Sequence, residues 1–280
     1  MEGIGNDFVM IDGRKLPDKD LIPYSRLAVT LCDRRFGIGA DGLIVVLDSA
    51  TCDLRFRIFN SDGSEAQMCG NGARCLARYV YESGMVEKSE ITVETLAGVI
   101  TPRLNFGPDG KIDSVTVDMG EPVLDPAKIP FLAQTPGSLV ETMETSLDKI
   151  SFTAVSMGNP HAVIFVDDAE NCPLHHLGPE IETHPRFPEK TNVEFIQVLS
   201  DTELRMRVWE RGAGVTLACG TGACAAAVAS ILNGKTGNKV LMHLDGGDLQ
   251  IEWNRKTNHI FKTGPANVVF QGRISLDEKG

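Results

Sequence analysis

The stretch CGNGA at residues 69–73 recurs as CGTGA at residues 219–223, 150 residues further along the chain. Each stretch runs into a segment that predicts a helix, over residues 72–81 and 222–232. Because glycine tolerates positive φ and lets a ligand approach the backbone closely, each stretch predicts a tight turn that opens a helix directly after a cysteine. Recurrence of so specific a stretch indicates an internal duplication.

A second pair of loops repeats in the same order. GNDF at residues 5–8 leads into a short apolar run, and GNPH at residues 158–161 leads into another. From Asn6 to Asn159 the offset is 153 residues, close to the spacing of the cysteine loops. Two independent motifs at nearly one spacing indicate two homologous halves, each with a Gly-Asn loop and a later Cys-Gly loop.

The remaining pattern favours a mixed fold. Short β-prone runs bounded by Gly, Pro, Asn and Asp occur at residues 43–47, 54–59, 91–94, 114–118, 152–156, 193–198, 204–209, 240–244 and 249–253. The helix predicted at 222–232 has no charge and small residues on every face, so it belongs inside a curled sheet. We therefore predict an α/β (α+β) fold of two pseudo-symmetric domains, each a curled mixed or antiparallel sheet around a central helix.

The halves suggest domain boundaries. Residues 1–119 form the first predicted domain and 120–264 the second, with 265–280 returning to the first. Pro-rich and acidic residues between positions 121 and 148 indicate a linker and surface region. The pair His175 and His176 carries no motif and is expected on a solvated loop.

Composition excludes several classes of function. Lys plus Arg is 27 against 38 Asp plus Glu, a net charge of −11, which argues against a nucleic-acid partner. No run approaches the roughly 20 apolar residues of a membrane span, and the N-terminus lacks a signal segment. Seven cysteines, odd in number and thinly spread, do not form a disulfide framework. A reducing, cytoplasmic location is expected, where unpaired thiols survive.

Other motifs are weak. GIGADG at residues 37–42 has dinucleotide-loop spacing but runs into a strand instead of a helix, so its glycines are interpreted as turn residues. The cysteines lack the close C-x-x-C spacing of structural zinc sites, and no flavin, haem, iron–sulfur or pyridoxal signature is evident. We expect no cofactor and no metal.

The cysteine loops themselves suggest a chemistry. The first N–H groups of a helix lack internal partners and carry the positive end of the dipole, so they bind a carboxylate and favour a thiolate. If a pseudo-twofold axis relates the halves, Cys69 and Cys219 would face one another across a cleft. One thiol could then remove a proton from one face of a carbon while the other delivers one, as a racemase or epimerase requires. The other five cysteines are interpreted as packing residues: Cys32, Cys52, Cys75, Cys172 and Cys224.

Over essentially its whole length the chain resembles the diaminopimelate epimerase family. The resemblance rests, in order, on the motifs GIGNDF, FNSDGSE, MCGNGARC, GNPH and WERGAG followed by ACGTGAC. It implies interconversion of LL- and meso-2,6-diaminopimelate in lysine and peptidoglycan precursor synthesis, by a homodimer. It also implies that Cys69 and Cys219 are the acid/base pair, with His161 and Glu210 close enough to tune the thiols or relay protons. Its implied substrate-binding residues are Asn6, Asn60, Gly70, Asn71, Asn159, Asn192, Glu210, Arg211, Gly220 and Thr221.

The chemistry of these positions suits the assignment. Diaminopimelate is zwitterionic at both ends, and side-chain amides both donate and accept hydrogen bonds without adding charge. Arg211 can pair with the distal carboxylate in a forked geometry. This chain starts almost at the Gly-Asn loop, whereas family members usually begin with a short strand, which leaves open a native start upstream of Met1.

Two alternatives remain open from sequence. A proline or hydroxyproline racemase would share the two thiols, although that family typically has His where Asn71 stands. A thiol redox or metal-binding protein is the alternative of another class. A duplicated binding module without catalysis is disfavoured, because both thiols stand at helix starts.

Overall fold

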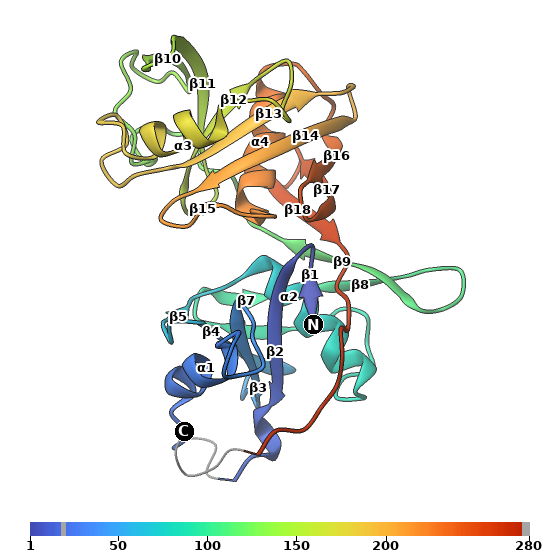
Figure 1. Cartoon of the computed structure of the whole chain (residues 1–280). Coiled ribbons are helices and arrows are strands. Elements are labelled where there is room, and N and C mark those ends of the chain that lie inside the picture. Colours follow the sequence, from blue (N-terminus) through green and yellow to red (C-terminus); the bar gives the residue numbers. More distant parts are fainter. Residues whose placement is uncertain (18–20, 276–280) are drawn as a thin grey trace. The chain divides into compact units, whose positions relative to one another are not determined.

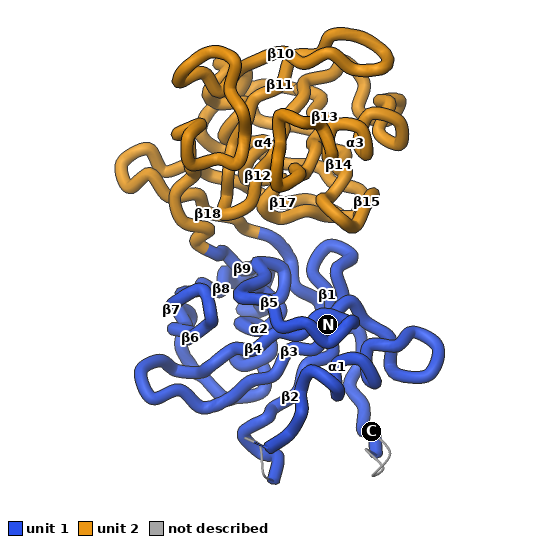
Figure 2. Tube along the Cα trace, turned by 90° about the vertical axis from the view of Figure 1, so that its left-hand side faces the viewer, with its two compact units in different colours: residues 1–117, 264–280 blue, residues 118–263 orange. Residues whose placement is uncertain are grey.

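A computed structural model describes residues 1–17 and 21–275 and divides the chain into two compact units (Figure 2). Unit 1 comprises Met1–Val117 and Gly264–Gly280, and unit 2 comprises Asp118–Thr263. Residues 276–280 of the predicted returning segment lie outside the described residues. Each unit is a sheet with helices, which confirms the predicted fold class (Figure 1).

Unit 1 is built mainly of short strands. Its elements are β1 (Glu2–Gly3), β2 (Asn6–Asp12), the 3-10 turn η1 (Gly13–Lys15), α1 (Tyr24–Cys32), β3 (Gly42–Leu47), β4 (Leu54–Asn60), β5 (Glu65–Ala66), α2 (Gly70–Glu82), β6 (Val93–Thr95), β7 (Gly98–Ile100), β8 (Arg103–Phe106) and β9 (Ile112–Asp118). The strands pair in the order β1-β2-β3-β4-β6-β7, with β5 on β4 and with β8 and β9 as a hairpin. The two-residue β1 is the only strand described ahead of the Gly-Asn loop.

Unit 2 repeats this plan with longer strands. Its elements are β10 (Val140–Glu144), β11 (Lys149–Ser156), β12 (Pro160–Phe165), α3 (Leu174–Glu182), β13 (Asn192–Val198), β14 (Glu203–Glu210), β15 (Gly214–Val215), α4 (Gly220–Leu232), β16 (Lys239–Leu244), β17 (Gly247–Asn254) and β18 (His259–Gly264). The strands pair in the order β10-β11-β12-β13-β14-β16-β17-β18, with β15 on β14.

The duplication is visible in the strand pairing. In unit 1, β2 is parallel to β3 across α1, and β4 is parallel to β6 across α2. In unit 2, β12 is parallel to β13 across α3, and β14 is parallel to β16 across α4. Even the short antiparallel partners β5 and β15 match. Each unit therefore carries the same β-α-β-β-β-α-β-β series, in agreement with the repeat inferred from the two pairs of motifs.

Helix α4 lies at the centre of unit 2. It packs against β11, β12, β13, β14, β16 and β17, and every residue from Gly222 to Ser230 is buried. Its alanines and other small side chains let the strands approach on all sides, as the uncharged sequence predicted. Asn233 caps its C-terminus, followed by Gly234 at φ 66°, a left-handed conformation that glycine adopts without strain.

Helix α2 is amphipathic. Its buried face, which includes Leu76 and Val80, joins the core formed by β3, β4 and β6, while Arg78 and Glu82 pair on the outer face. In place of a wholly apolar helix, unit 1 therefore has one with a polar side, because fewer strands cover it.

Two expectations from the sequence are wrong, and two helices were not predicted. Residues 121–148 are not a linker: they include β10, and Ile129, Phe131 and Met143 lie in the core of unit 2. His175 and His176 lie in helix α3, with exposed side chains, and not in a loop. Helices α1 and α3 were not predicted. In α3 a glycine and a proline obscure the helical pattern, but Gly178 permits contact with Trp209, whose Cγ would lie 2.7 Å from an added Cβ.

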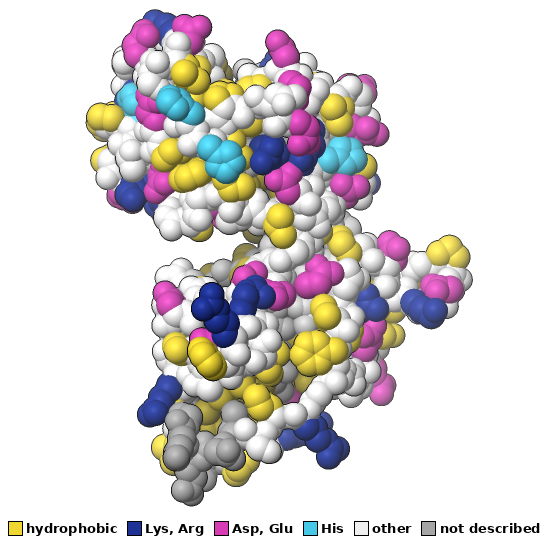
Figure 3. Space-filling model, viewed as in Figure 1, with side chains coloured by type: hydrophobic (Ala, Val, Ile, Leu, Met, Phe, Trp, Pro, Cys, Tyr) yellow, Lys and Arg dark blue, Asp and Glu magenta, His cyan; other side chains and the backbone are white. Residues whose placement is uncertain are grey.

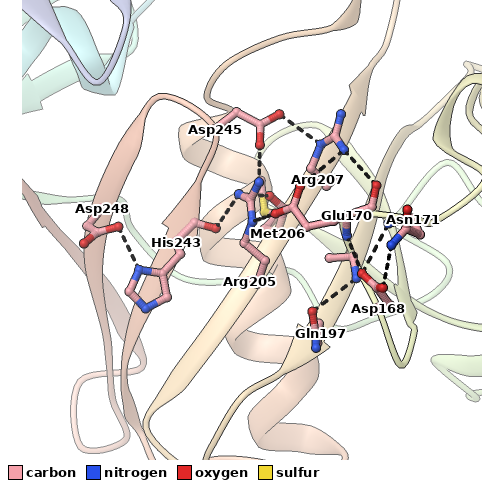
Figure 4. A network of polar contacts seen from close by, with 11 residues as sticks. Asp168, Glu170, Asn171, Gln197, Arg205, Met206, Arg207, His243, Asp245 and Asp248 are labelled. Atoms are coloured by element: carbon pink, nitrogen blue, oxygen red, sulfur yellow. Dashed lines mark hydrogen bonds and ion pairs between the residues drawn. The ribbon is translucent and has the colours of Figure 1, made fainter.

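An ion network ties strand β14 to neighbouring segments of unit 2 (Figure 4). Arg205 Nε lies 2.6 Å from Glu170 Oε1, and Arg207 Nε lies 2.9 Å from Asp245 Oδ2 in the β16–β17 turn. Acidic and basic side chains are also interspersed over the face of unit 2 shown in Figure 3. Among the described helices, none has the length and apolar character needed to cross a membrane.

Candidate active site

Cys69 and Cys219 occupy the same position in their units. Each is the N-cap of its helix, with an extended backbone, and each helix begins at the following glycine, Gly70 or Gly220. The Sγ atom of each cysteine lies 3.4 Å from the N–H of the third residue along, at Gly72 or Gly222. A thiol thus does what Ser or Asp usually does at a helix start, which brings sulfur to the positive end of the helix dipole.

The first helical turns offer further donors. The N–H groups of Gly70 and Asn71 at α2, and of Gly220 and Thr221 at α4, belong to the first turn, where backbone donors have no intrahelical acceptor. Each helix start can therefore bind one oxygen anion next to its thiol.

In unit 1, Cys69 lies beside two of the predicted substrate-binding amides, those of Asn6 and Asn71. The Oδ1 atom of Asn6 lies 3.9 Å from Cys69 Sγ and accepts a hydrogen bond of 3.3 Å from Asn71 Nδ2. The amide of Asn6 donates in turn to Asp41 Oδ2 at 2.7 Å. Arg74, three residues further along α2, fixes the Asn71 side chain: its Nη1 donates to Asn71 Oδ1 at 2.9 Å. The thiol is half-buried.

Asn60, the fourth amide predicted in unit 1, is set differently. It is the exposed last residue of β4, opposite Gly42, and its Nδ2 donates to Ser64 Oγ at 2.9 Å. It therefore belongs to the 60–64 turn, and its role in substrate binding stays a prediction.

In unit 2, Cys219 is almost wholly enclosed, with 3% of its surface exposed. Its Sγ lies 3.6 Å from the hydroxyl of Thr221. Burial raises the pKa of the Cys219 thiol well above its ordinary value, and the carboxylate of Glu210 raises it further. The resting state of Cys219 is therefore the protonated thiol.

A chain of hydrogen bonds continues from Cys219 into the core of unit 2. Thr221 Oγ1 accepts from Asn159 Nδ2 at 3.3 Å, and Asn159 Oδ1 lies 3.0 Å from His161 Nε2. The other ring nitrogen of His161, Nδ1, lies 2.6 Å from Glu194 Oε1. His161 and Glu194 are fully buried. The predicted residues Asn159, His161 and Thr221 are thus linked to one thiol.

The remaining predicted residues of unit 2 form a second group at the end of β14. The hydroxyl of Thr216 donates to Glu210. Asn192 is buried and uses its amide within the protein: Oδ1 accepts from the backbone N–H of Arg211 at 2.9 Å, and Nδ2 donates to Pro160 O at 3.0 Å. Arg211 is exposed, with Nη1 3.1 Å from Glu189 O. Asn192 therefore positions the Arg211 backbone, and its contact with substrate stays a prediction.

Three residues at these sites were not singled out from the sequence: Asp41, Arg74 and Glu194. Asp41 was hidden in the turn glycines of residues 37–42. The signal for Glu194 was available, because it is the one charged residue of the strand Asn192–Val198, and charges are buried only with partners. Arg74 gave no such signal, because its helix also carries Arg78 and Glu82. Arg74 and Glu194 are both fully buried.

None of the seven cysteines forms a disulfide bond. Cys32, Cys75 and Cys224 are buried as predicted, while Cys52 and Cys172 are half-buried. Burial raises the pKa of the Cys75 thiol to about 12 and that of Cys32 to about 11, so both stay protonated near neutral pH. Within residues 1–17 and 21–275, no three His, Cys, Asp or Glu side chains are grouped so that they could hold a metal ion.

Comparison with known proteins agrees with the motifs. The family model described as diaminopimelate epimerase matches residues 1–124 and 153–269. The diaminopimelate epimerase of Desulforapulum autotrophicum is 56% identical over 276 residues, which cover 99% of this chain and 98% of that protein. That of Moorella thermoacetica is also 56% identical, over 277 residues, covering 99% of this chain and 98% of that protein.

Solved structures share the fold at low identity. A phenazine biosynthesis protein of the PhzF family from Bacillus anthracis has a TM-score of 0.66 at 16% identity, covering 94% of this chain and 91% of that one. A hydroxyproline epimerase from Agrobacterium vitis has a TM-score of 0.63 at 20% identity, covering 94% and 86%. These two likenesses concern the fold alone. The full-length sequence matches, together with the paired cysteine N-caps, mean that the chain belongs to the diaminopimelate epimerase family.

Proposed function

We propose that this protein interconverts LL- and meso-2,6-diaminopimelate by moving the α-proton between two thiols, Cys69 and Cys219, without a cofactor. The observation that carries the proposal is the matched pair of cysteine N-caps, each with Sγ 3.4 Å from a first-turn N–H. In a chain of this family, both belong at one reacting carbon. One thiolate removes the proton from one face, and the other thiol delivers a proton to the opposite face.

The reacting α-carboxylate is bound by the first-turn N–H groups of Gly70, Asn71, Gly220 and Thr221. These donors also stabilise the negative charge that spreads from the α-carbon onto the carboxylate as the proton leaves. An α-proton of an amino acid is very weakly acidic, so this stabilisation supplies a large part of the rate enhancement.

The two thiols have different surroundings. Burial and the carboxylate of Glu210 hold Cys219 as the thiol, which makes it the proton donor in the resting protein. Cys69, half-buried and next to the amides of Asn6 and Asn71, is the base for that direction. After one turnover the roles are exchanged, so the reverse reaction starts with Cys219 as thiolate. His161 acts on Cys219 through Asn159 and Thr221, and Glu210 acts on it through its charge.

The far end of the substrate is held by groups that suit a zwitterion. Arg211 pairs with the distal carboxylate, and its exposed guanidinium is available for that purpose. The amides of Asn6, Asn60 and Asn159 supply donors and acceptors for the ammonium and carboxylate groups. Asn192, which holds the Arg211 backbone, contributes by fixing the direction of Arg211.

Solvent deuterium uptake at the α-carbon tests the proposal. Wild-type protein incubated with LL-diaminopimelate in D2O should form meso product that carries deuterium at one α-carbon. Cys69→Ala and Cys219→Ala should each slow net epimerisation by roughly 10²- to 10⁴-fold, since each lacks one proton-transfer group. Normal epimerisation by both single variants would rule out the two-base mechanism.

Substrate class separates this proposal from its rivals. A proline or hydroxyproline racemase would turn over free proline and leave diaminopimelate unchanged. A redox protein would cycle through a disulfide or hold stoichiometric metal, and its activity would be independent of α-proton exchange. On the epimerase proposal, a Cys69–Cys219 disulfide is an inactive form that a reductant restores.

Three further assignments belong to the proposal. Seven free thiols support a reducing, cytoplasmic location, and the substrate implies a place in lysine and peptidoglycan precursor synthesis. We also propose a homodimer, on the family likeness. Unit 1 exposes Phe36 and Phe270, large apolar side chains of the kind that subunit contacts cover. Sedimentation velocity at micromolar concentration should give twice the mass of one chain.

A further inference from the structure

The duplicated units differ directly beneath their catalytic helices. In unit 1, Phe8 on β2 pairs in register with Gly42 on β3, and Ile44 lies below the start of α2, with its Cδ1 3.0 Å from an ideal Cβ at Gly72. In unit 2, the corresponding register pair is His161 on β12 with Asn192 on β13. Two residues on, Glu194 lies below the start of α4, with Oε1 2.7 Å from an ideal Cβ at Gly222.

The repeat therefore places His161 where unit 1 has Phe8, and Glu194 where unit 1 has Ile44. Packing does not require polar side chains at these two positions, because Phe and Ile fill the equivalent space in unit 1. A buried acid and imidazole are expensive to desolvate and are kept where their polarity is used. They stand under Cys219, the thiol that starts protonated.

The hydrogen bonds of the pair have a definite direction. Asn159 donates from Nδ2 to Thr221 Oγ1, so its Oδ1 must be the acceptor for His161 Nε2, which therefore carries a proton. Thr221, having accepted this bond, keeps its own hydroxyl hydrogen free for Cys219 Sγ, 3.6 Å away. That hydroxyl stabilises the thiolate that forms when Cys219 has delivered its proton.

The short bond between Glu194 and His161 contains one further proton. Glu194 is 0% exposed, and its second oxygen, Oε2, has no hydrogen-bond partner in the part of the chain that the structure describes. An unpartnered oxygen costs much less to bury on a neutral carboxylic acid than on a carboxylate. Burial raises the pKa of Glu194; His161 lowers it in part, and Glu210 raises it. The proton therefore belongs on Glu194.

We propose that Glu194 is a positioning residue for the Cys219 half of the reaction: as a neutral acid it donates to His161 Nδ1 and so fixes the ring with its proton on Nε2. That tautomer orients Asn159, which orients Thr221 toward the thiol. The inference rests on the proposed epimerase function. Its structural part, the tautomer of His161, is independent of the reaction.

Two substitutions at position 194 separate hydrogen bonding from packing. Glu194→Gln keeps the shape and can donate an amide N–H to His161 Nδ1 in place of the acid proton. Glu194→Leu fills the space without a donor. We expect Glu194→Gln to retain kcat within about threefold. Glu194→Leu should lose roughly 100-fold, the upper end of the loss found when the hydrogen-bond partner of a metal-bound histidine is removed. Equal losses in both variants would overturn the proposal.

The tautomer is measured directly by ¹⁵N NMR of histidine-labelled protein, with the His161 signals assigned from a His161→Asn variant. Wild type and Glu194→Gln should show the proton on Nε2 and a bare Nδ1, and Glu194→Leu should show a mixture of tautomers. An imidazolium, protonated on both nitrogens, in wild type would overturn the assignment of a neutral acid. This measurement decides the inference even if wild type does not epimerise diaminopimelate, which would instead refute the proposed function.

A double variant guards against misfolding of Glu194→Leu. His161→Phe with Glu194→Ile gives unit 2 the apolar pair that unit 1 carries, and replacing a buried polar pair by well-packed apolar residues is often neutral or stabilising. We expect it to unfold no more readily than wild type and yet to lose kcat at least as much as Glu194→Leu. Wild-type turnover by this folded variant would show that the buried pair has no positioning role.

Discussion

The cysteine and first helical turn at the start of α2 and of α4 (the α2 half-site and the α4, or Cys219, half-site) have the same backbone, but different side chains lie beneath them. Both helices are 13 residues long and begin after a cysteine N-cap. Both carry glycine at the third position, where side chains of the underlying sheet come closest to the helix backbone. Beneath α2 that layer is apolar, and a buried Arg74 holds Asn71 from the helix itself. Beneath α4 it is the pair His161 and Glu194.

The comparison shows which structural features both thiols need and which are specific to one of them. The N-cap and the first-turn N–H groups are common, because both half-sites bind the same carboxylate and both activate a thiol. The buried polar side chains differ: Arg74 lies in unit 1, and the pair His161 and Glu194 lies in unit 2. A two-base reaction starts with one thiol ionised and one protonated, so unequal surroundings at equal backbones are what the chemistry requires.

The largest effect on stability is expected at Arg74. Arg74→Met removes a fully buried guanidinium that donates to Asn71 Oδ1 and, through Nε, to Pro265 O at 3.0 Å. Because one buried and one partly buried acceptor lose their donor, the free energy of unfolding should fall by about 2–4 kcal/mol, as measured by urea denaturation.

Arg78→Met is the matched control. Arg78 also reaches the returning segment, at Ala266 O, but its side chain is 22% exposed, so we expect a loss of about 1 kcal/mol or less. Equal losses for the two variants would show that the buried guanidinium is not the foundation of the α2 half-site.

The two glycines beneath the helix starts should tolerate a methyl group unequally. At Gly222 a Cβ would lie 2.7 Å from Glu194 Oε1, whose bond to His161 prevents it from moving away. At Gly72 the neighbour is the flexible end of Ile44, at 3.0 Å. Gly222→Ala should lower the free energy of unfolding by about 1–3 kcal/mol. Gly72→Ala should lower it less, since the gain in helix propensity of about 1 kcal/mol offsets the strain. Equal costs in thermal denaturation would contradict this.

Removing the carboxylate of Glu210 should change the reactivity of Cys219 and leave that of Cys69 unchanged. Because Glu210 raises the pKa of Cys219, Glu210→Gln should lower that pKa, and iodoacetamide should then alkylate Cys219 faster at a fixed pH near 8. Peptide mapping of the same samples gives the rate at Cys69 as an internal control, which should not change. A slower reaction at Cys219, or equal changes at both thiols, would refute the electrostatic role.

The smallest effect is expected in the ion network on β14 (Figure 4). Asp245→Asn weakens the contacts with Arg205 and Arg207, whose side chains are 16% and 18% exposed. Partly exposed pairs contribute little, so the free energy of unfolding should fall by about 1 kcal/mol or less, with no change in turnover. A large loss of turnover in Asp245→Asn would mean that changes anywhere in unit 2 disturb the site around Cys219. The losses of turnover in the Glu194 variants would then be no evidence for a specific role of Glu194.

Local pattern was sufficient for the duplication and for the helix starts. The glycines after Cys69 and Cys219 predicted turns that open helices, and α2 and α4 begin within two residues of the predicted positions. Pattern was insufficient where packing overrides propensity. Helix α3 contains Gly178 because Trp209 packs against it, and segment 121–148 looks like a linker although Phe131 reaches the core.

The sequence by itself determined that this chain is a duplicated two-thiol protein, because residue type and spacing report local backbone geometry and recur at one offset. Only the tertiary structure decided what lies under each thiol. Glu194 meets His161, 33 residues away, because β12 and β13 run parallel in a register set by α3 between them and by the core they share. Periodicity along one strand carries no record of the neighbouring strand's register, so a buried partner of this kind emerges only from the folded sheet.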